Sequence, residues 1–290
     1  MPGGYAHTEG KFSMSTISRR AILAGVAPAT IGVAAIGAAP AEAALPVVYM
    51  DRMVVQSQVE PWTNRNSGLP GDDGVKEIQK ALRAKFGGVT VDGQFGDQTR
   101  AAYARWQRAL GYTGNAANGI IGPSSLTRLG SGRFSVARKI DVGGHVSYSG
   151  VTLNARTRAM LVAADAKVSW SLDATKGSFV GCDGNSACTH AVGGAVDVVI
   201  PWSGTRHWQT VRALRQVGFA AWYRPTIPGV WTRHIHAIAI GDTDTHIQAA
   251  DQVGDYYLGR SGLSGHAADN TPAAYRVGFT WWEAYRRGSR

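Results

Sequence analysis

The sequence predicts an α+β protein in which a small three-helix domain precedes a larger α+β domain with a mainly antiparallel sheet. Apolar residues recur at helical spacing between residues 73 and 130. Beyond residue 142, short apolar runs of strand length alternate with helical segments without a regular crossover rhythm. With 37 glycines and 17% charged residues in a chain of 290, the composition favours a folded, loop-rich protein over a disordered one.

The first 43 residues predict a signal for export. Ser18-Arg19-Arg20-Ala21-Ile22-Leu23 opens an Ala/Gly-rich apolar stretch that ends at Ala41-Glu42-Ala43, the pattern of a twin-arginine signal peptide with a small-residue cleavage site. We expect cleavage near Ala43-Ala44, and translation could begin at Met14 instead of Met1. A membrane anchor is the alternative, but the stretch is weakly hydrophobic and Pro28 interrupts it. We therefore expect a secreted protein without a stable membrane span.

The formal net charge of +10 predicts a partner of negative charge. Nucleic acid, acidic lipid and the anionic polymers of a bacterial cell wall all fit that description. No run of basic residues indicates nucleic acid, so for an exported protein we expect wall polymers and no nucleic acid.

The two cysteines, Cys182 and Cys188, predict a disulfide. Outside the cell, two cysteines this close in sequence pair more often than they bind metal. The bond would close a small loop just before His190. Its effect on stability should be modest, because a short loop restricts the unfolded chain least.

Composition divides the exported chain into five parts. Residues 44–72 hold scattered Pro, Gly and Asn and are expected to be an irregular lead-in. Residues 73–130 form the three-helix domain, and residues 131–141 form a polar linker. Residues 142–265 form the second domain, and residues 266–290 form a C-terminal tail.

Three helices are predicted in the first domain. Val75, Ile78 and Leu82 lie at helical spacing after Asp72 or Asp73 as the N-cap, residues 99–110 form the second helix, and the third begins near Ser124. The motif consists of Val75, Ile78-Gln79 and Leu82, then Asp92-Gly93-x-Phe95-Gly96-x-x-Thr99, then Trp106-Gln107, then Gly119-Ile120-Ile121-Gly122-Pro123.

This motif resembles the three-helix peptidoglycan-binding domain. The order of its elements and the two similar Asp/Asn-Gly turns carry the resemblance. Membership of that family implies attachment to the cell wall, with peptidoglycan as the partner, and does not imply catalysis.

The second domain is expected to contain two helices and four strands. The predicted helices are residues 153–167 and 207–217, and the predicted strands are residues 168–173, 195–200, 219–223 and 234–240. In the tail, Trp281, Trp282 and Tyr285 are expected to pack against this domain, with stacking on sugar rings as the alternative.

Four residues of this domain form a candidate metal site. His190 precedes the Gly193-Gly194 turn and Asp197 lies in the strand that follows, so the turn can bring the imidazole and the carboxylate together. His234 and His236 lie two positions apart in a strand and therefore face the same side of the sheet. From the residues alone, a buried Asp could equally be part of a charged pair or a structural hydrogen bond.

The spacing His190-x-x-Gly193-x-Ala195-x-Asp197, followed by His234-x-His236, resembles the zinc D-alanyl-D-alanine carboxypeptidases and their relatives that cut L-alanyl-D-glutamate bonds. This resemblance covers about residues 142–245. It implies that His190, Asp197 and His236 bind Zn²⁺, that His234 lies beside the metal, and that stem peptides of peptidoglycan are the substrate.

Two positions depart from that family. Arg233 occupies the position of the general base, an Asp or Glu three residues before the last zinc ligand, and an arginine cannot act as a base near neutral pH. Lys176 is the cation in the stretch where the family has a substrate-binding arginine, so it is the candidate for that catalytic role.

Two functions remain open at this point. In the first, the protein is a zinc peptidase in which His234, or Asp242 or Asp244 from the following loop, carries the proton. Alternatively, it binds peptidoglycan, with or without zinc, and does not cut it.

Overall fold

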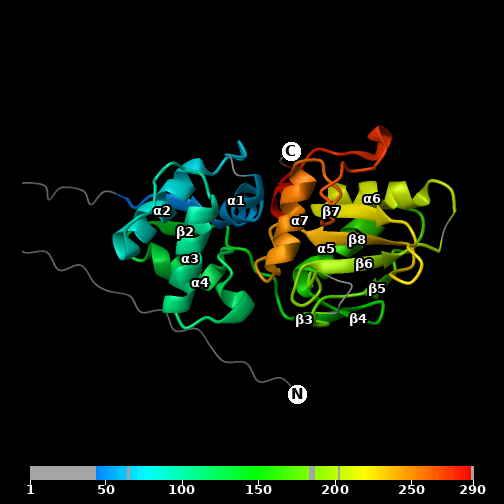
Figure 1. Ribbon diagram of the computed structural model, residues 1–290, viewed down its shortest axis with the longest axis horizontal. Coiled ribbons are helices and arrows are strands. Elements are labelled where there is room, and N and C mark those ends of the chain that lie inside the picture. The colour runs from blue at the N-terminus through cyan, green and yellow to red at the C-terminus, as the bar shows by residue number, and fades with distance from the viewer. Residues whose placement is uncertain (1–43, 64–65, 183–186, 202, 289–290) are drawn as a thin grey trace, which may run out of the picture. The chain divides into compact units, whose positions relative to one another are not determined.

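The computed structural model describes residues 44–63, 66–182, 187–201 and 203–288. Helices and strands are mixed in it, which confirms the α+β class (Figure 1). Residues 44–290 make up one compact unit. The predicted signal peptide, residues 1–43, lies outside the described residues.

The N-terminal part of the described chain is mainly helical. Its elements are β1 (Val47–Tyr49), α1 (Met50–Thr63), α2 (Asp72–Phe86), α3 (Asp97–Ala109), the 3₁₀ turn η1 (Gly114–Ala117), α4 (Pro123–Gly130) and β2 (Ser135–Ala137). Helices α2, α3 and α4 confirm the three predicted helices, and Ile78, Tyr103 and Leu126 meet in their shared core. The N-cap of α2 is Gly71, so the prediction of Asp72 or Asp73 at that position was wrong.

Two similar turns follow α2 and α3, and a buried glutamine of the preceding helix holds each of them. Gln79 accepts hydrogen bonds from the N–H groups of Asp92 and Gly93 at 3.0 and 2.9 Å. Gln107 accepts one from Gly119 at 2.8 Å. Both glycines have φ of +87°, a conformation that favours glycine over every other residue. The repeated Asp/Asn-Gly pattern therefore encodes the same turn twice.

The segment 44–72 was expected to be irregular, and this expectation was wrong. It contains β1 and the 14-residue helix α1. Met53 and Val54 of α1 pack into the core of the helical part, whereas Val55 and Val59 pack against the C-terminal part. A helix that is buried on several sides has no continuous polar face, so its amphipathic period is weak in the sequence.

The polar linker 131–141 also contains regular structure. Its strand β2 pairs in parallel with β1, so that Val48 lies opposite Val136. The start of the described chain is thereby joined to the segment that follows the three helices.

The C-terminal part contains the remaining helices and strands. They are β3 (His145–Tyr148), β4 (Val151–Asn154), α5 (Ala155–Asp165), β5 (Ala174–Lys176), β6 (Ala195–Val199), α6 (Arg206–Gln216), β7 (Phe219–Arg224), β8 (His234–Ala239), α7 (Ile247–Tyr257), η2 (Ala273–Tyr275) and α8 (Trp282–Arg286). Strands β5, β6, β8 and β7 form, in that order, a four-stranded antiparallel sheet. The predicted sheet type is confirmed.

Side chains alternate between the two faces of this sheet, as expected for extended strands. One face packs Val196, Val198 and Ile235 into a core with helices α5 and α6. On the other face, Ala195 and Ile238 pack against residues of α1 and α7. Each fully buried Val or Ile contributes about 1.5–3 kcal/mol relative to an exposed one, so both layers hold the strand register in place.

The bounds of several helices and strands differ from the predicted ones. The helix expected at 153–167 begins at Ala155, because the side chain of Asn154 caps it by accepting from the N–H of Thr157 at 2.8 Å. Residues 168–173 do not form the expected strand, and β5 follows at Ala174. Helix α7 was not predicted.

The aromatic residues of the tail pack against the sheet, which confirms the preferred expectation for them. Trp281 is 8% exposed and lies in the same core as Ala220 and Trp222. Trp282 packs against the core on the opposite face of the sheet. The close approach of this segment explains Gly218, since a Cβ there would lie 2.6 Å from the backbone nitrogen of Trp282.

None of the helices in the described part of the chain combines the length and the apolar character needed to cross a membrane.

A carboxylate in α7 predicts how stability depends on pH. Burial raises the pKa of Asp251 to about 8, although Arg100 lowers it, and Asp255 and Asp97 raise it further. Its Oδ1 atom has no hydrogen-bond partner. Because the folded state then holds a proton that the unfolded state releases, the free energy of unfolding should fall as pH rises from the ordinary value of 3.8 to about 8.

We expect Asp251→Asn to flatten this dependence and to raise the free energy of unfolding at pH 8 relative to the wild type. Urea unfolding at roughly pH 5, 6, 7 and 8 measures it. Asp73→Asn is the matched control, because the Asp73 side chain is 99% exposed. Parallel pH profiles for the wild type and Asp251→Asn would contradict the prediction.

Candidate metal centre

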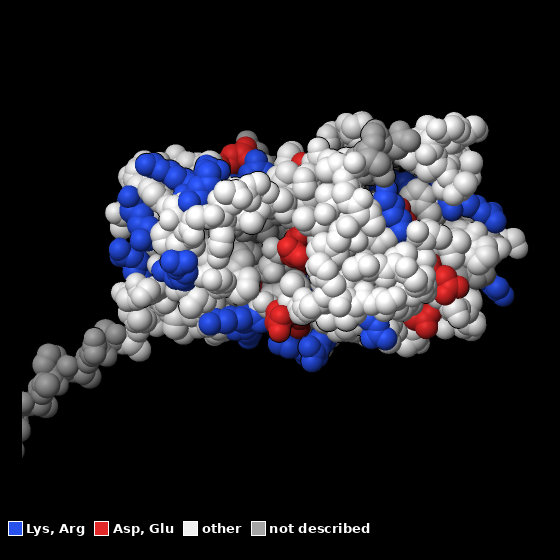
Figure 2. All heavy atoms as spheres, turned by 90° about the horizontal axis from the view of Figure 1, so that it is seen from below, with Lys and Arg blue, Asp and Glu red and all other residues white. Residues whose placement is uncertain are grey.

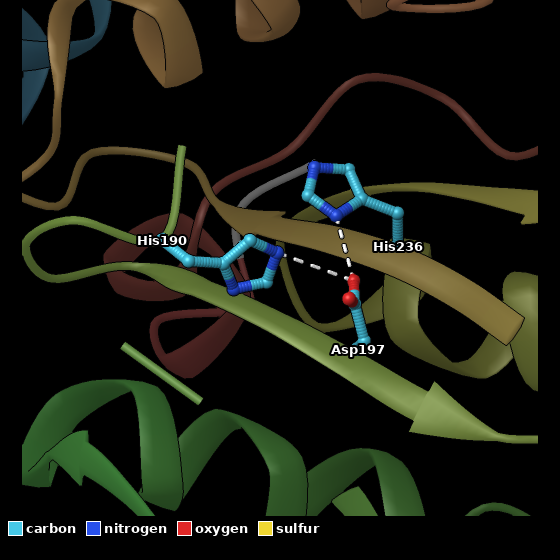
Figure 3. Close-up of side chains that lie close together, drawn as sticks. All are labelled: His190, Asp197 and His236. Atoms are coloured by element: carbon cyan, nitrogen blue, oxygen red, sulfur yellow. Dashed lines mark hydrogen bonds and ion pairs between the residues drawn. The ribbon is translucent and has the colours of Figure 1, made fainter. Parts of the chain in front are cut away.

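The strand register brings the predicted ligands together. Asp197 of β6 lies directly opposite His236 of β8, and Trp222 of β7 lies on the other side of His236. His190 reaches the same place from the turn before β6 (Figure 3). The His and Asp residues of the motif therefore share one point on one face of the sheet.

The ligand atoms of His190, Asp197 and His236 all lie within 4.8 Å of one another. Asp197 Oδ1 is 2.8 Å from His236 Nδ1 and 3.3 Å from His190 Nε2. His234 Nε2 lies farther out, 3.9 Å from the same oxygen. The structure thus separates three converging atoms from a fourth beside them, as the sequence predicts.

The outer nitrogens of the two imidazoles face fixed acceptors. His190 Nδ1 lies 2.8 Å from the carbonyl oxygen of Gly177, and His236 Nε2 lies 2.8 Å from Gln252 Oε1. A neutral imidazole has a single N–H group, which either its outer acceptor or Asp197 Oδ1 can take. When the outer acceptors take it, the inner nitrogens, His190 Nε2 and His236 Nδ1, have lone pairs that can bind a metal beside Asp197 Oδ1.

The charge states agree with this arrangement. Burial lowers the pKa of His236 below its ordinary value, and the neighbouring Asp197 only partly offsets the effect. Burial by itself would raise the pKa of Asp197, but the contacts with His190 and His236 hold it well below its ordinary range. A neutral imidazole and an ionised carboxylate are the forms that bind a metal.

Backbone contacts hold His190 rigidly. Its carbonyl accepts from the N–H of Val180 at 3.1 Å, in addition to the contact between its ring and Gly177. Gly177 packs so closely that a Cβ would lie 2.3 Å from the carbonyl oxygen of Thr152. The turn that leads to Asp197 contains Gly194 at φ +84°, where glycine is favoured.

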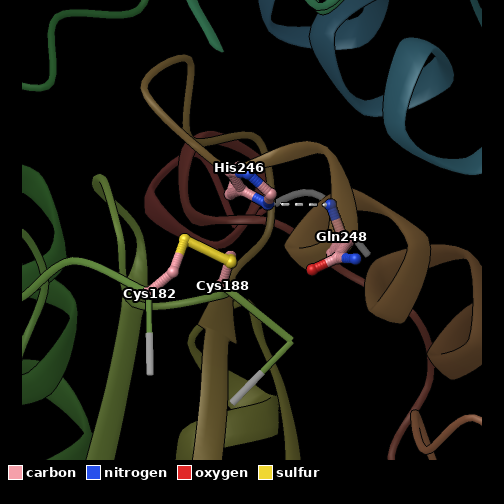
Figure 4. Close-up of a disulfide and its surroundings, with 4 residues drawn as sticks. All are labelled: Cys182, Cys188, His246 and Gln248. Atoms are coloured by element: carbon pink, nitrogen blue, oxygen red, sulfur yellow. Dashed lines mark hydrogen bonds between the residues drawn. A yellow bond between two sulfur atoms is a disulfide. The ribbon is translucent and has the colours of Figure 1, made fainter. Parts of the chain in front are cut away.

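The predicted disulfide between Cys182 and Cys188 is present (Figure 4). It closes the loop that ends two residues before His190. The disulfide restricts the chain next to His190. Figure 4 also shows His246, the N-cap of α7, which accepts a hydrogen bond from the N–H of Gln248 at 3.3 Å.

His190, Asp197 and His236, the three candidate ligands, line a cavity of about 760 Å³. Its other described lining residues include Thr175, Lys176, Ala187, Thr189, Val199, Arg224, Trp231, Arg233, His234 and Gln252. The structure thus places both predicted catalytic residues, Lys176 and His234, at this cavity together with Arg233. Lys176 lies opposite Asp197 on the edge strand β5.

Asp242 and Asp244, the alternative proton carriers, are not among the described residues that line the cavity. Asp242 is fully buried, and its Oδ2 accepts hydrogen bonds from Asn154 at 2.8 Å and from Thr157 at 3.2 Å. Its contacts are those of a structural residue.

Two residues of the site were missed from the sequence. Gln252 belongs to the unpredicted helix α7. Arg224 ends β7, one residue past the predicted strand, and continues the inward positions of Ala220 and Trp222. A charge at an inward strand position was the signal that could have identified it.

Comparison with protein families gives a match in the helical part. Residues 71–129 match the model of the family described as Putative peptidoglycan binding domain. This match supports a peptidoglycan-binding domain in the helical part, and such a domain indicates association with the cell wall. Comparisons with curated proteins and with solved structures returned no match.

The contact between Gln252 and His236 yields a prediction about metal affinity. Removing a partner that orients a metal-bound imidazole typically weakens metal binding about 10–100-fold. We expect Gln252→Ala to weaken zinc binding by this order, measured by competition with a chromogenic chelator. Gln248→Ala, in the first turn of the same helix, is the control and should bind as the wild type does. Equal affinity in Gln252→Ala and wild type would exclude this role of Gln252.

Proposed function

We propose that this protein is an exported, peptidoglycan-binding zinc peptidase that cuts stem or cross-bridge peptides of the bacterial cell wall. The single observation that carries the proposal is the convergence of two imidazole nitrogens and one carboxylate oxygen in an open cavity. The peptidoglycan-binding domain in the same compact unit supplies the substrate class.

The donor set supports zinc as the metal. Two His nitrogens and one carboxylate oxygen, with a further position open, are typical of catalytic zinc sites, whereas closed sets of four ligands are typical of structural ones. The acceptors at the outer nitrogens, Gly177 O and Gln252 Oε1, can hold both imidazoles in the tautomers that bind a metal. When bound, zinc polarises a substrate carbonyl and lowers the pKa of coordinated water towards neutrality.

His234 is the residue we assign to proton transfer. Its Nδ1 lies 2.8 Å from the carbonyl oxygen of Thr232, which takes the N–H and leaves Nε2 facing the ligands. Arg233 lines the cavity in the family's base position and cannot accept a proton there. In this proposal, His234 therefore acts as the general base in place of the residue at position 233.

Lys176 and the walls of the cavity hold and orient the peptide in this proposal. Lys176 places a positive charge at the edge strand, opposite Asp197. Trp231 and Val230 add apolar surface to the cavity, and the Trp231 ring centroid lies 6.1 Å from that of His234.

A second function is favoured by Arg233 itself. Because this guanidinium stands where the family has a base, the protein could hold zinc and recognise stem peptides without cutting them. It would then be a wall-binding protein of the same specificity. The two functions share the metal site and differ in turnover.

Export and wall polymers belong to the same proposal. The compact unit begins at Ala44, where the predicted cleavage site falls. Figure 2 shows a face on which Lys and Arg side chains gather over the helical part. Residues 71–140 contain eleven Lys and Arg against five Asp and Glu. This excess favours contact with anionic wall polymers around the peptidoglycan.

Incubation of the zinc-loaded protein with purified sacculi, followed by mass spectrometry of the released muropeptides, tests the proposal. We expect new peptide ends with the wild type and none with His190→Ala, which should still sediment with the sacculi. Sedimentation without new ends in the wild type would reject the peptidase and favour the binding protein.

Position 233 provides a sharper test of the proton path. Arg233→Asp restores a carboxylate in the base position and should raise the cleavage rate at least tenfold if a base is limiting. Arg233→Gln removes the charge without adding a base and is the matched control. An equal rise in both variants would mean that the arginine only obstructs the cavity.

A further inference from the structure

Three arginines are buried in the described part of the chain, and one of them lacks a full set of partners. Arg156 donates to Glu283 and to the carbonyl of Ile240. Arg215 donates twice to the carbonyl of Ala221 and pairs with Asp269 at 2.9 Å. Arg224 is 5% exposed, and its Nη2 atom is buried with no hydrogen-bond partner.

The position of Arg224 directs it to the metal centre. It lies directly opposite His234 in the pairing of β7 with β8. His234 in turn lies opposite Val199 of β6, and all three line the cavity. Arg224, His234 and Val199 thus form a row across the sheet. This row lies two residues along the strands from the row of Asp197, His236 and Trp222, so both rows face the same side of the sheet.

The nearby carboxylates are already engaged. Asp197 contacts His190 and His236, and Asp269 pairs with Arg215 and also accepts from Thr271 at 2.8 Å. The Cζ atom of Arg224 lies over the ring of Trp222, 5.2 Å from the ring centroid, and this cation–π contact positions the guanidinium. Burial lowers the pKa of Arg224 to about 10, so the group remains charged at neutral pH.

We propose that Arg224 binds a carboxylate of the substrate. Arg224 lines the cavity, and its guanidinium makes no hydrogen bond or ion pair with another described residue. Such a group matches a carboxylate better than any other peptide group, because the two form short charge-assisted hydrogen bonds in a planar geometry. The inference rests on the proposed function, which supplies a peptide as the ligand and places the bond that is cut at the metal centre.

The location of Arg224 restricts which peptide fits. Its row neighbours the ligand row, so the bound carboxylate lies close to the bond that is cut. Two carboxylates of stem peptides meet this condition: the C-terminal carboxylate beside a final peptide bond, and the free α-carboxylate of a γ-linked glutamate. Both present the same group to Arg224, and the experiment separates them.

Calorimetric titration of the zinc-loaded full chain with uncleavable peptides tests the inference. One pair of probes is a D-alanyl-D-alanine analogue whose amide is reduced, with either a free C-terminal carboxylate or a carboxamide. The other pair is a γ-D-glutamyl analogue with a free or amidated α-carboxylate. We expect the wild type to bind the acid of at least one pair at least tenfold more tightly than its amide, and that pair identifies the source of the carboxylate.

Variants assign the preference to a residue. Arg224→Gln should abolish the preference for the acid, and Arg224→Lys should keep part of it, because the charge remains but the fork is lost. Arg233→Gln removes another cation of the same cavity and should keep the preference. The inference is overturned if the wild type shows no preference in either pair, or if Arg224→Gln retains it.

Stability gives an independent readout. Since Nη2 of Arg224 has no partner, Arg224→Gln should leave the midpoint of urea unfolding unchanged or raise it, whereas Arg215→Gln should lower it. A loss of stability in Arg224→Gln as large as in Arg215→Gln would indicate a structural role and overturn the inference.

The two proposals fail separately. A preference for acids without new peptide ends in sacculi would leave the Arg224 subsite in place and reject the peptidase. New peptide ends without a preference for acids would reject the subsite alone.

Discussion

The pairing register of strands β6 and β8 is the constraint on which the site depends. It sets Asp197 opposite His236 and Val199 opposite His234. A slip of one residue would turn either strand's inward side chains to the other face, where α5 and α6 pack. The register is secured by apolar residues of the same strands, such as Val196 and Ile238, in the two cores. Folding energy and site geometry therefore come from alternating residues of the same two strands.

Helix α7 connects the metal centre to the helical part of the protein. Gln252 on one side of the helix contacts His236, whereas Val253 and Ala249 pack in a core with Val55 and Val59 of α1. Gly254 allows this contact, since a Cβ there would lie 2.6 Å from Trp62. The peptidoglycan-binding domain and the metal centre are consequently parts of one packed unit. Gln252, which contacts the candidate ligand His236, comes from the helix at which they meet.

Much of this arrangement follows from the sequence alone. The three helices of the first domain, the strands at 195–200 and 219–223, and the convergence of His190, Asp197 and His236 with His234 beside them were all predictable, because amphipathic periods and motif spacings are local signals. Helix α1 was missed because burial on several sides removes its polar face. Gln252 and Arg224 were missed because their roles depend on which distant segments meet them. The orientation of the two imidazoles likewise depends on the positions of Gly177 and Gln252, which the spacing of the motif does not encode.

The convergence of His190, Asp197 and His236 on one metal ion is the central claim, and X-ray absorption at the zinc edge of the purified mature protein tests it most directly. We predict one zinc per chain, bound by two imidazole nitrogens and light oxygen or nitrogen atoms at about 2.0–2.2 Å, without sulfur. The imidazole scattering should fall by half in His236→Ala. A spectrum with sulfur ligands, or a purified protein that takes up no stoichiometric zinc, would contradict the account.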